Sequence, residues 1–94
     1  MSEHVARSLL HTALDEYRRR AYADLVGGIG RPDVRTARGA DGREYEIEIE
    51  AMWDDRPGGV LRVLGAIDDG SFRAFLPLSE EFLLSPEGRI VGEK

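Results

Sequence analysis

The chain of 94 residues contains no cysteine, which excludes a disulfide framework and a zinc site built from thiolates. It also lacks any apolar run near the roughly 20 residues that a membrane-spanning helix needs. The first residues have neither the basic start nor the apolar stretch of a signal peptide. We therefore expect a cytoplasmic protein without a membrane partner, since a chain free of cysteine fits a reducing compartment.

Positive charge is scarce in the second half of the chain. The formal net charge is −5, and residues 1–43 carry 8 basic and 6 acidic groups while residues 44–94 carry 5 basic and 12 acidic groups. Because phosphate contacts dominate affinity for nucleic acids, this balance predicts no nucleic-acid partner. An acidic surface suits a basic protein partner, although solubility alone explains it equally well.

The stretch from Glu44 to Leu78 predicts an antiparallel meander around which the rest of the chain is organised. Residues 45–53 alternate between apolar and polar side chains, which is typical of a half-buried strand. The predicted inner face carries Tyr45, Ile47, Ile49, Ala51 and Trp53. The opposite face is an acidic strip interrupted by one apolar residue, Met52.

Residues 61–67 predict the next strand, with Leu61, Val63, Gly65 and Ile67 on the inner face. Asp69-Gly70 fits a two-residue type I′ turn, which would set Ile67 opposite Phe72, Gly65 opposite Ala74 and Val63 opposite Leu76. In that register the outer face of the meander gathers two arginines and three apolar side chains: Arg62, Arg73, Met52, Leu64 and Phe75.

The flanking segments complete the predicted fold. Apolar residues recur at helical spacing from Ser2 to Val26, which predicts one long amphipathic helix with Ser2 as its N-cap. Residues 33–39 predict an edge strand, turned at Asp41-Gly42 so that Val34 faces Ile49 and Arg35 faces Glu48 across the strands. Phe82 to Val91, with a turn at Pro86-Glu87-Gly88, predicts a small closing hairpin.

We therefore expect a single α+β domain over residues 1–94. A long N-terminal helix (1–27) packs on an antiparallel β-meander of three to four strands (33–78), and a closing turn and C-terminal β-hairpin follow (79–94).

The acidic pairs Asp54-Asp55 and Asp68-Asp69 are the candidate catalytic clusters. They lie at opposite ends of a strand, about 20 Å apart, so they cannot share one site, and each pair fits turn chemistry. His4 and His11 are seven residues apart on the predicted helix, too far to share a metal ion. We expect no metal site and no cofactor. A small-molecule or enzymatic site formed by Trp53, Asp54, Asp55 and Arg62 remains the alternative.

The outer face of the sheet is the favoured contact surface. Met52, Leu64 and Phe75 predict an apolar patch among charged side chains, and such patches often mark contacts. The occupant is another protein, a second copy of the chain, or the C-terminal hairpin folding back. The leading hypothesis is a non-enzymatic protein-binding module, and a sharper alternative is an immunity- or antitoxin-like inhibitor of a basic partner. The candidate binding residues are Met52, Trp53, Asp54, Asp55, Arg62, Leu64, Arg73 and Phe75.

Residues 44–93 also resemble a family of small, uncharacterised bacterial proteins. The resemblance lies in Trp53-Asp54-Asp55, the stretch Arg62–Gly70, Pro77-Leu78 and Pro86-Glu87-Gly88. It implies a bacterial origin and carries no activity, cofactor or partner.

Overall fold

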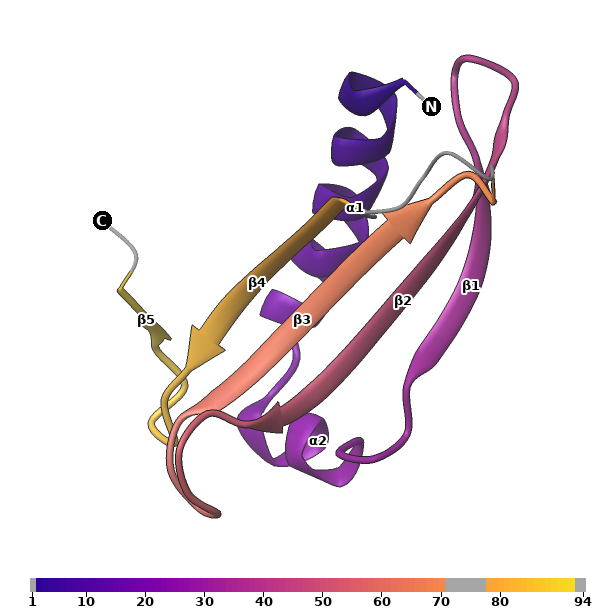
Figure 1. The fold of residues 1–94 in the computed structure, drawn as a ribbon. Helices are drawn as coiled ribbons and strands as arrows, with labels where there is room; N and C mark the ends of the chain where they lie inside the picture. The colour runs from indigo at the N-terminus through magenta and orange to yellow at the C-terminus, as the bar shows by residue number, and fades with distance from the viewer. Residues whose placement is uncertain (1, 71–77, 93–94) are drawn as a thin grey trace.

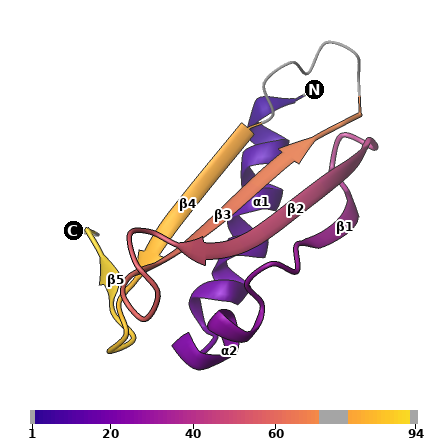
Figure 2. The ribbon, with the colours of Figure 1, turned by 60° about the horizontal axis from the view of Figure 1, so that its bottom comes forward.

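The computed structural model describes residues 2–70 and 78–92. Two helices, α1 (Glu3–Arg18) and α2 (Tyr22–Gly27), precede five strands: β1 (Asp33–Arg38), β2 (Glu44–Trp53), β3 (Leu61–Asp68), β4 (Leu78–Leu84) and β5 (Ile90–Val91). The strands form one antiparallel sheet in the order β1-β2-β3-β4-β5. Both helices lie on the same side of this sheet (Figures 1 and 2). The α+β class is confirmed, and the described strands form one sheet of five where a meander of three to four strands and a separate hairpin were expected.

The predicted single helix over residues 2–26 is wrong, because it divides into α1 and α2. The N-terminal prediction is correct, since the Ser2 hydroxyl accepts a hydrogen bond from the Val5 amide at 3.3 Å. The chain leaves the helix after Arg18, and Ala21 is extended at ψ 149°. This break turns α2 back toward the sheet, where Leu25 joins the core and the Tyr22 hydroxyl donates to the Gly59 carbonyl at 2.6 Å.

The core lies between α1 and the inner face of β2 and β3, as the alternation predicted. Every second residue of β3, from Leu61 to Ile67, is buried, and β2 buries Tyr45, Ile47, Ile49 and Ala51. Helix α1 contributes Ala6, Leu10, Ala13, Leu14 and Tyr17.

Gly65 is a point of close approach between α1 and β3. A Cβ atom at this position would lie 2.9 Å from Leu10 Cδ1 and 3.1 Å from Leu14 Cδ2. Both leucines are fully buried. The absence of a side chain on Gly65 therefore allows these two leucines to rest directly on β3.

The predicted register of β1 is wrong by one residue. Residues 39–43 form a longer connection, closed by a hydrogen bond of 2.8 Å from the Gly39 amide to the Arg43 carbonyl. Val34 consequently lies opposite Glu48 and Arg35 opposite Ile47. A shift of one residue exchanges the two faces of a strand, so Val34 is 55% exposed and Arg35 points to the helix side.

The predicted type I′ turn at Asp69-Gly70 is also wrong. Such a turn needs a positive φ at both residues, and Gly70 alone has one, at 72°. β3 pairs instead with the later segment β4, so that Ile67 faces Leu78 and Gly65 faces Glu80. The predicted partners Phe72, Ala74 and Leu76 lie outside the described residues. The later register places Phe82 and Leu84 in the core, which is the physical reason to prefer it.

Part of the predicted closing hairpin is thus a full member of the sheet. β4 continues into a turn in which the Ser85 amide donates to the Arg89 carbonyl at 2.9 Å, and Gly88 adopts φ 86°. The short β5 then pairs Val91 with Leu83 and Ile90 with Leu84.

Polar contacts join the C-terminal half of α1 to β1. Asp33 accepts hydrogen bonds of 2.5 Å from the Tyr17 hydroxyl and from Arg35, and Arg35 also donates to Glu16 at 3.1 Å. The hydrogen bonds from Arg35 and then from Tyr17 lower the pKa of Asp33, whereas burial and the Asp33 bond raise the pKa of Tyr17. The ionised Asp33 carboxylate is therefore the form that the fold stabilises.

Substitution of Gly65 tests the contact between α1 and β3. Gly65→Ala asks for a small shift of two leucine side chains and should cost about 1–2 kcal/mol of unfolding free energy, as overpacking does. Gly65→Val adds branched bulk and should cost more than about 3 kcal/mol or prevent folding. Urea denaturation measures both. The exposed Gly27, which has no neighbour within 4 Å of an added Cβ and no positive φ, is the control, and an equal loss in Gly27→Ala would contradict the steric explanation.

The hydrogen bonds of Asp33 predict that the stability of the protein falls at acidic pH. Because the pKa of Asp33 is lowered in the folded state, its contribution is complete above the unfolded pKa of about 3.9 and is lost as the pH falls below that value. Asp33→Asn should therefore destabilise the protein at pH 7 and much less at pH 3, and Tyr17→Phe should cost about 1 kcal/mol at pH 7. An Asp33→Asn effect of equal size at both pH values would contradict this assignment.

Candidate functional site

The outer face of the sheet is the surface that no described helix or strand covers, and it is the candidate site. Figure 1 shows this face toward the viewer, with α1 behind the sheet. The alternation of buried and exposed residues, together with the register, assigns its side chains. They are Val34, Thr36, Arg38, Glu44, Glu46, Glu48, Glu50, Met52, Arg62, Leu64, Ala66, Asp68, Ser79, Glu81, Leu83 and Val91.

An apolar patch lies on this face at the end where β2 stops and β3 begins. The register aligns Met52, Arg62, Leu83 and Val91 in one row across four strands, with Leu64 in the next row. Met52, Leu64 and Leu83 are half-buried and Val91 is 40% exposed. We call Met52, Leu64, Leu83 and Val91 the outer apolar patch.

Arg62 lies in the middle of the outer apolar patch and is held by two carboxylates. Its guanidinium donates to Asp54 through Nη2 at 2.6 Å and Nε at 3.1 Å, and to Glu81 through Nη1 at 2.7 Å. The hydrogen bond to Asp54, followed by the charge of Glu81, raises the pKa of Arg62. A paired arginine surrounded by apolar side chains is a common composition for the centre of a protein interface.

A row of four acidic side chains runs along β2 beside the patch. We call Glu44, Glu46, Glu48 and Glu50 the glutamate row; neighbours within it are about 6.8 Å apart along the strand. The cross-strand neighbours of Glu46 and Glu48 are Thr36 and Val34 on one side and Asp68 and Ala66 on the other. Within residues 2–70 and 78–92, Glu46, Glu48 and Glu50 form no ion pair. These three glutamates therefore present negative charge that no cation of the described residues pairs with.

The structure divides the sequence-predicted site residues between two faces. Met52, Arg62 and Leu64 come together on the outer face, and Asp54 joins them through its bond to Arg62. Asp55 is exposed in the turn after β2. Arg73 and Phe75 lie outside the described residues.

Trp53 belongs to the inner side of the sheet. Its half-buried ring packs against the core, and its centroid is 6.5 Å from that of Tyr22 in α2. The Trp53 ring and the Asp54 carboxylate therefore lie on opposite faces, which separates the parts of the alternative small-molecule site. Among the described residues, no group of three or more His, Cys, Asp or Glu side chains is arranged to hold a metal ion.

Around Arg62, sequence reasoning missed the three residues that β4 and β5 contribute: Glu81, Leu83 and Val91. The alternation of Glu80, Phe82 and Leu84 against Ser79, Glu81 and Leu83 was present in the chain, but residues 82–84 were assigned to a separate hairpin. Extending the strand back to Leu78 would have revealed the two faces of β4.

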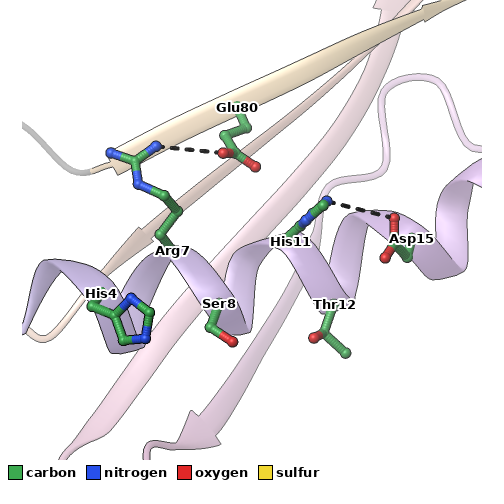
Figure 3. Close-up of a pocket in the computed structure, with 7 residues that line it drawn as sticks. All are labelled: His4, Arg7, Ser8, His11, Thr12, Asp15 and Glu80. Carbon is green, nitrogen blue, oxygen red and sulfur yellow. Dashed lines mark hydrogen bonds and ion pairs between the residues drawn. The ribbon is translucent and has the colours of Figure 1, made fainter.

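A shallow cavity of about 330 Å³ lies on the opposite side of the molecule, along α1 (Figure 3). Its residues are His4, Arg7, Ser8, His11, Thr12, Asp15 and Glu80. Figure 3 shows Arg7 directed toward Glu80, at 3.4 Å, and His11 directed toward Asp15, at 4.0 Å. Successive residues of this set follow the helix surface, so the hollow is a groove of mixed charge beside α1. Both histidines are exposed.

Comparisons of the chain with protein-family models, with curated proteins and with solved structures gave no match. Neither described helix has the length and apolar character needed to cross a membrane.

We expect the Trp53 side chain to contribute to the stability of the folded protein. Trp53→Ala removes a half-buried ring beside Tyr22 and should lower the unfolding free energy by about 2–3 kcal/mol, less than for a fully buried tryptophan. Asp55→Ala, at the exposed turn two residues later, should change it by less than about 0.5 kcal/mol. Denaturation followed by far-ultraviolet circular dichroism measures both without relying on tryptophan fluorescence. A Trp53→Ala variant as stable as the parent would indicate that the ring serves another purpose.

Proposed function

We propose that this protein is a cytoplasmic, non-enzymatic binding module that holds another protein against the outer face of its sheet. The observation that carries the proposal is the outer apolar patch around Arg62, on a face that the described elements leave open. Met52, Leu64 and Leu83 expose enough apolar surface to gain from burial, while Arg62 already has its carboxylate partners. A partner that covers the patch gains apolar contact without breaking these bonds.

The glutamate row supports a basic partner. Glu46, Glu48 and Glu50 lie beside the patch and form no ion pair within the described residues, so they attract positive charge. Steering of this kind acts mainly on the association rate and weakens as salt is added.

A second candidate function follows from the same row. An immunity- or antitoxin-like inhibitor neutralises one basic protein by covering its active or binding surface, and a small acidic sheet face suits that task. This candidate differs from a general module in one respect: the bound partner loses its activity.

Affinity capture with matched variants tests the proposal. The wild-type protein, Leu64→Glu in the patch and Thr12→Glu on the exposed side of α1 are immobilised and exposed to lysate of the source cells. A specific partner should bind the wild type and Thr12→Glu, and its retention should fall at least tenfold on Leu64→Glu because a charge then replaces the buried contact. The same proteins on all three columns would contradict an outer-face site.

The captured partner then serves to test its charge. Changing both Glu46 and Glu48 to glutamine should slow its association several-fold, whereas Glu87→Gln, in the exposed turn after β4, should leave it unchanged. Raising the salt from about 0.1 M to about 0.5 M should weaken wild-type binding. If neither added salt nor the change of the two glutamates alters binding, a basic partner is excluded. Loss of the partner's own activity in the complex would favour the inhibitor.

A further inference from the structure

The free edge of β1 is a second surface with a defined chemistry. In the described part of the chain, β1 is an outermost strand of the sheet, and Figures 1 and 2 show no element beside it. The hydrogen bond from the Gly39 amide to the Arg43 carbonyl marks a hydrogen-bonded pair with β2. Since such pairs alternate along an antiparallel ladder, the odd-numbered residues of β1 bond β2. The backbone groups of Val34, Thr36 and Arg38 therefore point away from the sheet.

Only one charged residue, Arg38, protects this edge, which is less than edge strands usually carry. Arg35, which the sequence placed on the outer side of the strand, points to the helix side and is bound there by Asp33 at 2.5 Å and Glu16 at 3.1 Å. Arg38, at the end of the strand, donates to the Gly42 carbonyl at 2.8 Å. The residues that present the edge are thus two uncharged ones, Val34 and Thr36, and one arginine.

We propose that β1 pairs with β1 of a second copy of this chain, in an antiparallel register centred on Thr36. A two-fold axis then sets Thr36 opposite Thr36 of the second copy, and Val34 opposite its Arg38. Each of the three pairs exchanges two backbone hydrogen bonds, and the two five-stranded sheets become one. The backbone pairing of this interface uses the free edge of the sheet and none of the outer apolar patch.

The register follows from the residues of the strand. A shift by two residues in either direction leaves two hydrogen-bonded pairs in place of three. One of these shifts also sets Arg35 opposite Arg35 of the second copy, which like charges disfavour. The register centred on Thr36 places no like charges opposite one another and makes a threonine pair, which is favourable across strands.

Side-chain complementarity supports a second copy as the occupant. Val34 is the most exposed large apolar side chain described, at 55%, and in this register the aliphatic stem of Arg38 from the second copy lies over it. The next residue across the sheet from Val34 is Glu48, which forms no ion pair within the described residues. In the dimer the guanidinium of that Arg38 exchanges its bond to the Gly42 carbonyl for this carboxylate. Pairing through the outer face would instead bring two glutamate rows together.

Cysteine cross-linking tests the register, since the chain has no cysteine of its own. In the proposed dimer the two Thr36 Cα atoms are about 5.5 Å apart, within the range for a disulfide. Val34 lies opposite Arg38 of the second copy, so the two Val34 Cα atoms are separated by four residues, or about 13 Å along the strand. Under mild oxidation Thr36→Cys should form a disulfide-linked dimer at least tenfold faster than Val34→Cys. Equal rates, or no cross-link in either variant, would overturn the proposal.

Light scattering tests the interface without a cross-link. Wild type and Thr36→Ala should reach twice the monomer mass of 10.5 kDa as the concentration rises toward about 1 mM. Thr36→Pro should remain monomeric, because proline removes an amide that points away from β2 and leaves the β1–β2 ladder intact. Circular dichroism verifies that this variant is folded. If it does not fold, the comparison of Thr36→Cys with Val34→Cys tests the interface in its place. A wild type that stays monomeric, or a dimer that resists Thr36→Pro and dissociates with Leu64→Glu, would overturn the proposal.

Discussion

The direct contact of Leu10 and Leu14 with Gly65 is the constraint on which the rest of the structure depends. Helix α1 crosses the sheet at the one inner position of β3 that carries no side chain. This close approach sets the spacing between the helix and the sheet, and thereby the depth at which Ile47, Ile49 and Phe82 are buried. A core with a single helical layer over five strands has little other means to exclude water.

Because the described helices all lie on one side of the sheet, no helix covers the side chains of the outer face. The same period of two that buries one set of residues in β2 and β3 exposes the other. On this exposed face β2 carries the glutamate row, and β3 carries Arg62 and Leu64. Hydrogen bonds from two core tyrosines, Tyr17 to Asp33 and Tyr45 to Asp41, join this apolar layer to the chain at opposite ends of β1.

The sequence predicts the faces of strands better than their partners. Tyr45 to Ala51 alternate strictly between apolar and acidic residues, and the apolar residues Leu61, Val63 and Ile67 fit the same period of two. The inner face and the outer positions of Met52, Arg62 and Leu64 followed from this period. The registers of β1 and β4 failed because both Asp-Gly pairs were assigned to two-residue turns. Asp41 instead accepts bonds from the Tyr45 hydroxyl at 2.5 Å and the Arg43 amide at 3.1 Å, which stabilise a longer connection. Leu83 and Val91 escaped prediction for the same reason, because their place on the outer face depends on the β4 register. The division of the N-terminal helix had no local signal, since Leu25 and Tyr22 find their partners only in the folded core.

The separation of charge between the two layers has a consequence for encounters in solution. Arg18 ends α1 and Arg19 and Arg20 follow it on one side of the sheet, and the glutamate row lies on the other. Among the described residues the outer face therefore carries an excess of negative charge, which gives the charge distribution a dipole component directed at that face. The electric field of a cationic protein exerts a torque on such a molecule before the two come into contact. The outer face is then already directed at the partner in a larger share of collisions. Orientation of this kind needs no flexible segment and no conformational change, because it is a property of how a one-sided α+β sandwich distributes its arginines and glutamates.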